Sequence, residues 1–93
     1  MQLSNGIQKV DILNQLTDYY KLDSTTKAKD FALQASIMAE RLNYKPGIGY
    51  SSQNLGYIEY LYGNFNDAIK YCQEASEIAD NLQDPRLKLR TYE

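Results

Sequence analysis

Small residues at helical spacing are the feature of this sequence that most restricts its fold. Gly56 lies seven residues before Gly63, and Ala68, Ala75 and Ala79 follow at helical steps. Gly63 is a turn signal, as is the asparagine after it, because both residue types tolerate the left-handed backbone found just past a helix end. Small residues on both sides of such a turn let two antiparallel helices approach closely. The sequence therefore predicts a tightly packed helical hairpin.

A similar pattern recurs forty residues upstream. The identical pairs under this shift are Asn14 and Asn54, Tyr20 and Tyr60, Ala28 and Ala68, Ala35 and Ala75, Ser36 and Ser76, Ala39 and Ala79, and Leu42 and Leu82. A fixed period of this kind indicates stacked copies of one helical unit. Such stacks present extended surfaces that usually bind other molecules, and they rarely catalyse reactions.

Apolar residues at three- and four-residue steps predict five helices. We expect them over about 7–22, from an Asp23–Thr26 cap to about residue 43, over 46–62, over 65–82 and over 85–93. The second helix should bury an inner face made of Ala28, Phe31, Ala32, Ala35, Met38, Ala39 and Leu42. In the third, one side should carry Ile48, Leu55, Ile58 and Tyr62, and another Tyr50, Gln53, Tyr57 and Tyr60.

The charged and titratable residues exclude several classes of function. Twelve acidic and ten basic residues leave a formal charge of −2, which offers no electrostatic basis for binding nucleic acid. The chain has no histidine, which removes the commonest general base, and its single cysteine, Cys72, lies in no cluster of basic residues that could activate it. We therefore expect no enzyme activity and no cofactor. Cys72 is interpreted as a small packing residue.

The sequence also lacks a calcium-binding loop and a long apolar run. The acidic side chains are spaced along helices without a glycine-containing calcium loop, so we read them as solvated faces and expect no metal site. No run of about 18 apolar residues occurs, so we expect no membrane contact within this chain. The opening Met1–Gly6 carries no signal segment and is interpreted as a tail or cloning remnant.

The second copy of the pattern resembles the tetratricopeptide repeat. Leu55-Gly56 matches that family's Leu-Gly, Gly63 with Phe65 matches its inter-helix turn, and Ala68 and Ala75 match its small residues. The first copy departs from the family because Gln15-Leu16 replaces Leu-Gly. The forty-residue period also exceeds the family's usual 34 residues. Repeats of this length are most similar to those of bacterial regulatory proteins.

The resemblance implies an all-α fold of antiparallel hairpins stacked as a right-handed superhelix. Its expected parts are a tail over 1–6, a degenerate repeat over 7–44, a second repeat over 45–84, and a capping helix or start of a third repeat over 85–93. It also implies a non-enzymatic interaction module that binds a peptide or helix of a partner protein in a concave groove. A cytoplasmic signalling protein is the expected parent, with the periplasm as the alternative if that parent is a sensor.

Matching the family's groove positions to this chain gives ten candidate partner-binding residues. They are Val10, Leu13, Thr17, Tyr20, Lys21, Tyr50, Gln53, Tyr57, Tyr60 and Leu61. Tyrosines at such spacing offer large contact area with few rotamers to order, which suits peptide binding. The alternative is that some of these rings pack against neighbouring helices. Asn54 and Asn14 could belong to a carboxylate clamp, but its companion basic residues are absent, so we reject that ligand.

Two further expectations follow from the same alignment. Glu59 occupies a position normally held by an aromatic residue between helices, so its carboxylate should reach solvent or accept hydrogen bonds from hydroxyls. A second functional hypothesis is homo-oligomerisation through exposed hairpin ends, with Leu87 and Leu89 as contact residues. It follows because two repeats leave apolar ends uncovered.

Overall fold

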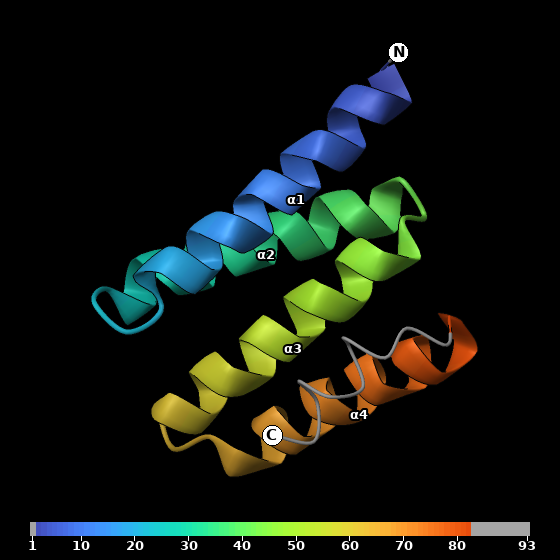
Figure 1. Ribbon diagram of the computed structural model, residues 1–93. Coiled ribbons are helices and arrows are strands. Elements are labelled where there is room, and N and C mark those ends of the chain that lie inside the picture. Colours follow the sequence, from blue (N-terminus) through green and yellow to red (C-terminus); the bar gives the residue numbers. More distant parts are fainter. Residues whose placement is uncertain (1, 83–93) are drawn as a thin grey trace.

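The computed structural model describes residues 2–82, which form four α-helices (Figure 1). The helices are α1 (Gln2–Tyr20), α2 (Thr25–Arg41), α3 (Lys45–Leu61) and α4 (Phe65–Leu82). The first four predicted helices are confirmed. Residues 2–6, interpreted from the sequence as part of a tail or cloning remnant, belong to the start of α1, so this helix begins earlier than the expected residue 7. The predicted helix over 85–93, with Leu87 and Leu89, lies outside the described residues.

The turns before α3 and α4 have the same geometry. In both, one residue takes a left-handed backbone, Asn43 with φ 55° and Gly63 with φ 85°. The amide of the next residue then bonds to a carbonyl of the preceding helix, Tyr44 N–H to Ala39 at 2.8 Å and Asn64 N–H to Glu59 at 2.8 Å. These bonds satisfy helix-end carbonyls and let the next helix begin at once. The turn predicted at Gly63 is confirmed.

The cap predicted before α2 forms only in part. Ser24 is the N-cap residue, but its side chain makes no capping hydrogen bond. The Thr25 hydroxyl instead donates to the Lys21 carbonyl at 3.2 Å, which ties the start of α2 back to the end of α1. The start of α3 is close to the predicted residue 46. Pro46 occupies the first turn of α3, where a missing N–H costs no hydrogen bond.

The four helices form two antiparallel hairpins, α1–α2 and α3–α4 (Figure 1). The α3 helix packs against α1, α2 and α4, and α1 and α3 run in the same direction. Within residues 2–82, the α1 and α4 backbones make no contact. The described helices therefore build an open stack with α3 in its middle. None of these helices combines the length and the apolar character that a membrane span requires.

Alanines make this close packing possible. Two core clusters lie beside α2: one contains Val10, Leu13, Ala35, Ala39 and Ile48, and the other Ala28, Ala32, Leu55 and Ile58. The predicted alanine face of α2 is thereby confirmed. Tyr62, which the sequence placed on the same side of the third helix as Leu55 and Ile58, differs from them in being 45% exposed.

The α3 and α4 helices lie close together at Gly56, where the sequence predicted close approach. A Cβ atom at Gly56 would lie 2.9 Å from Sγ of Cys72 and 3.2 Å from the carbonyl oxygen of Ala68. Both distances are shorter than ordinary van der Waals contact, so a side chain at residue 56 would push α4 away. Ala75 and Ala79 continue the seam and are fully buried.

Candidate functional site

The expected groove positions on α1 lie in the core. Val10 and Thr17 are fully buried and Leu13 is nearly so, and Val10 and Leu13 pack in the cluster beside α2. The Thr17 hydroxyl donates to the Leu13 carbonyl at 2.9 Å, one turn earlier on the same helix. Gln53 on α3 is also buried. The prediction that these four residues line an open groove is wrong, because this stripe of α1 packs on the neighbouring helices.

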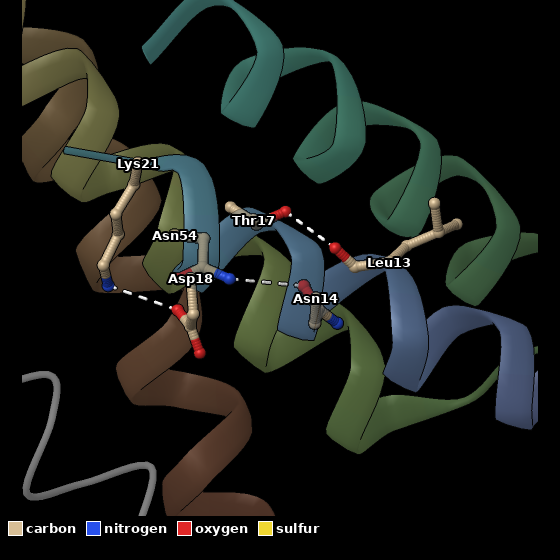
Figure 2. A network of polar contacts seen from close by, with 6 residues as sticks. All are labelled: Leu13, Asn14, Thr17, Asp18, Lys21 and Asn54. Carbon is tan, nitrogen blue, oxygen red and sulfur yellow. Dashed lines mark hydrogen bonds and ion pairs between the residues drawn. The ribbon is translucent and has the colours of Figure 1, made fainter. Parts of the chain in front are cut away.

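A different stripe of α1 lies along α3. We call this region the α1–α3 seam and define it as Asp11, Asn14, Asp18 and Lys21 on α1 with Tyr50, Asn54 and Tyr57 on α3. The Asn54 amide donates to the side-chain oxygen of Asn14 at 3.4 Å (Figure 2). The Lys21 ammonium lies 4.8 Å from the centre of the Tyr57 ring. The seam therefore contains three of the ten predicted residues: Lys21, Tyr50 and Tyr57.

The two ends of the seam are charged. At one end the Lys21 ammonium pairs with Asp18 at 3.2 Å (Figure 2). The same ammonium lies over the Tyr57 ring. At the other end the Tyr44 hydroxyl donates to Asp11 at 3.0 Å. Burial and this hydrogen bond raise the pKa of Tyr44 to about 12. The seam thus offers cationic, anionic and aromatic groups along one line.

The middle of the seam is polar and buried. Asn14 is 8% exposed and Asn54 is 1% exposed. One hydrogen bond joins them, but Nδ2 of Asn14 and Oδ1 of Asn54 have no hydrogen-bond partner in the described part of the chain. Leaving a buried amide atom unpaired costs about 1 to 3 kcal/mol. The unpaired atoms of the two asparagines therefore lower the stability of the fold in the middle of the seam.

The tyrosines predicted to line one groove lie in different surroundings in the structure. Tyr57 is 38% exposed beside the seam. Tyr60 is 59% exposed and its ring centre lies 5.6 Å from that of Phe65, at the turn into α4. Tyr20 is half-buried and stacks on Phe31 of α2 at 5.8 Å, which is the packing alternative considered from the sequence. Leu61 is exposed near the same turn as Tyr60.

Glu59 joins three elements of the fold. Its carboxylate, 5% exposed as a residue, accepts a hydrogen bond from the Asn64 amide at 2.7 Å and pairs with Lys29 of α2 at 2.9 Å. The expectation that Glu59 is held by hydrogen bonds is confirmed, but an amide and an ammonium replace the expected hydroxyls. The Asn64 bond and then the Lys29 contacts lower the pKa of Glu59, against the opposing effect of burial.

Cys72 has the properties of a packing residue. It is half-buried, and burial raises the pKa of its thiol, so the reactive thiolate is disfavoured. Its sulfur occupies the space that a side chain at residue 56 would need. Across residues 2–82, no three histidine, cysteine, aspartate or glutamate side chains come together as a metal site.

The sequence interpretation did not place Asp11, Asn14 and Asp18 in the site. The signal that could have found Asn14 was present, since it is identical to Asn54 under the forty-residue shift. A scan against protein-family models, a search of curated proteins and a search of solved structures each found no match to this chain.

Proposed function

We propose that this chain is a non-enzymatic protein–protein interaction module that binds a peptide or helix of a partner protein across the α1–α3 seam. The observation that carries the proposal is the contact between Lys21 and Tyr57 beside the Asn14–Asn54 pair. It puts a cation, an aromatic ring and buried amides from two equivalent helices into one surface. The chain has no histidine, and its one cysteine, Cys72, belongs to α4 and not to the seam.

The arrangement of the helices supports a tetratricopeptide-like stack. Helices α1 and α3 run in the same direction and touch through equivalent asparagines, as expected if each is the first helix of one repeat. The lack of contact between the α1 and α4 backbones in residues 2–82 leaves the stack open. Open stacks of this kind present extended surfaces that bind other chains. A right-handed superhelix in a larger bacterial regulator is the architecture we propose.

The chemistry of the seam suits a peptide with mixed polar character. The Tyr57 ring provides a flat apolar surface, while Lys21 and Asp18 provide one charge of each sign. Asn14 Nδ2 is a donor and Asn54 Oδ1 an acceptor, and both lack partners in the described region. A peptide that turned these amides outward would supply the hydrogen bonds that they lack, so part of its binding free energy would come from relieving their burial.

A displayed library of short random peptides tests this proposal. Peptides enriched on the intact chain are measured again by calorimetry against Tyr57→Ser and Lys21→Ser. We expect each variant to weaken binding by about tenfold or more, because a side chain in the centre of an interface contributes on the order of 1 to 2 kcal/mol. The matched control is Ile37→Ser, which changes an exposed residue of α2 outside the seam.

Two results would contradict the proposal. One is a library that yields no peptide binding to the intact chain. The other is a set of enriched peptides that bind Tyr57→Ser and Lys21→Ser as tightly as they bind the unmodified chain. Melting curves of the variants must match that of the unmodified chain, since a loss of folding would mimic a loss of binding.

A further inference from the structure

The α1–α3 seam combines an acid with a tyrosine at two levels. Asp11 and Asp18 are seven residues apart on α1, and Tyr50 and Tyr57 are seven residues apart on α3. Seven residues make two helical turns, so each pair spans about 10.5 Å along its helix. At the second level the Lys21 ammonium pairs with Asp18 at 3.2 Å and lies 4.8 Å from the centre of the Tyr57 ring. This combination of acid and ring therefore holds a cation.

The first level has the same groups. The Tyr44 hydroxyl donates to the Asp11 carboxylate at 3.0 Å, and both Asp11 and Tyr50 act electrostatically on the pKa of Tyr44, so the three side chains are neighbours. Asp11 is exposed, and within residues 2–82 no lysine or arginine pairs with it. A carboxylate beside aromatic rings suits an arginine, whose planar guanidinium can bond to the acid and stack on a ring.

One short segment of the chain carries the matching charges. Residues 2–82 contain seven basic and ten acidic side chains, whereas Arg86, Lys88 and Arg90 fall within five consecutive positions. Arg86 and Arg90 are four residues apart, so they point to the same side whether the segment is extended or helical. An extended segment would separate their Cα atoms by about 13 Å, close to the two-turn spacing of the seam. The segment therefore complements the seam in charge and in spacing.

The segment also begins at a suitable end of the molecule. Helix α4 ends at Leu82, and because α3 and α4 are antiparallel, that end lies beside the start of α3 (Figure 1). Tyr44 directly precedes α3 and bonds to Asp11, so the first level of the seam faces the same end. Residues 83–93 span up to about 36 Å when extended. That length exceeds the roughly 15 Å from Asp11 to Lys21 along α1.

We propose that the basic segment over residues 86–90 binds along the α1–α3 seam of its own chain, with an arginine between Asp11 and Tyr50. The proposal rests on the proposed function, because it makes the seam a site for a basic peptide and gives the partner peptide a competitor. A partner must displace the segment, so its apparent affinity falls in proportion to the fraction of chains whose seam is open. A basic residue of the partner would take the place of the arginine.

Disulfide trapping in the full chain tests the contact. Both variants carry Cys72→Ala and Lys88→Cys, which places a thiol between the two arginines. Gln15→Cys adds a second thiol one turn after Asp11, whereas Leu33→Cys, the control, adds one at an exposed position of α2. We expect mild oxidation to link residues 15 and 88 within one chain, as detected by mass spectrometry of the monomer, and to leave the Leu33→Cys variant reduced.

Charge reversal tests what holds the segment in place. In the variant that links residues 15 and 88, Asp11→Arg should slow disulfide formation at least about threefold, because it replaces an attractive charge by a repulsive one. Adding Arg86→Asp and Arg90→Asp should restore the rate, since the two signs are then exchanged.

Peptide binding gives a second measurement. Arg86→Ser/Arg90→Ser should bind the peptides enriched on the seam at least about threefold more tightly than the unmodified chain, because the competing segment is weakened. Lys45→Ser/Lys70→Ser is the matched control, since it removes two exposed lysines outside the seam. At physiological ionic strength, where distant charges are screened, the control should leave the affinity unchanged.

The proposal is overturned if residues 15 and 88 link no faster than residues 33 and 88, if the disulfide joins two chains, or if exchange of both signs does not restore the rate. Equal gains in peptide affinity for the arginine variant and the lysine control would also overturn it. If trapping fails while peptides still bind the seam, only this proposal is wrong. If trapping succeeds in a chain that binds no peptide, the segment occupies the seam and the proposed function is wrong.

Discussion

The side-chain amide of Asn54 donates a hydrogen bond to the side-chain oxygen of Asn14 over 3.4 Å, although forty residues separate the two in the sequence. The two asparagines coincide when the sequence is shifted by forty residues. The contact therefore fixes how far α3 lies along α1. A buried asparagine pair can specify register in this way, at some expense of stability.

Replacing one asparagine should be worse than replacing both. Asn54→Leu leaves Asn14 buried without any partner, so we expect the free energy of unfolding to fall by about 1 to 3 kcal/mol. Asn14→Leu/Asn54→Leu should recover most of that loss, because two apolar groups need no hydrogen bonds. Urea denaturation of the unmodified chain, both single variants and the double variant measures the coupling. Losses that simply add would contradict the pairing.

The Glu59 carboxylate should make the stability sensitive to acid. Its hydrogen bond from Asn64 and its contacts with Lys29 lower its pKa in the folded chain below the ordinary value of 4.5. The stabilisation is therefore fully present above pH 4.5 and is lost as the pH falls through the lowered pKa. Glu59→Gln should cost about 1 to 3 kcal/mol at neutral pH.

A series of urea titrations between neutral pH and pH 2 measures how the stabilisation by Glu59 depends on pH. The difference between Glu59→Gln and the unmodified chain should shrink as the solution becomes acidic, because the protonated carboxyl and the amide are then both neutral. Asp67→Asn, which changes an exposed acid at the start of α4, is the control. A difference that stays constant over the whole range would show that the charge of Glu59 does not stabilise the fold.

The Gly56 contact should not accept a methyl group. Alanine normally favours a helix over glycine by about 1 kcal/mol, but here its Cβ would overlap Cys72 Sγ and the Ala68 carbonyl. We expect Gly56→Ala to lower stability by about 1 to 3 kcal/mol, the usual effect of overpacking. Gly56→Ala/Cys72→Ala should recover part of the loss by removing the sulfur. Thermal melting that rises in Gly56→Ala would contradict the close packing of α3 and α4.

The two left-handed turn residues should differ in how much stability they lose on substitution. Gly63→Ala places a Cβ in a left-handed backbone, which costs about 1 to 2 kcal/mol. No neighbouring atom adds to that cost, since the surrounding space is open. Asn43→Gly should change stability much less, because glycine adopts the same backbone freely. Circular dichroism melts compare the two variants, and equal losses would contradict the backbone explanation.

The sequence by itself determined the four described helices, the turn at Gly63 and the alanine faces of the hairpins. These follow from local properties: helical periodicity, the backbone freedom of glycine, and the small volume of alanine. The inner face of α2 could be predicted because Ala28, Ala32, Ala35 and Ala39 recur at helical steps, and all four are buried. Asn54 and Asn14 were also visible as equivalent residues, although not as a contact.

Only the tertiary structure decided which side of α1 and α3 faces solvent. Val10, Leu13 and Thr17 resemble a groove stripe in sequence, yet they are buried, while the next stripe, with Asp11, Asp18 and Lys21, borders α3. Periodicity identifies faces but not their partners, because the rotation of a helix about its axis depends on the helices packed against it. The division of the tyrosines between seam and turn was decided in the same way.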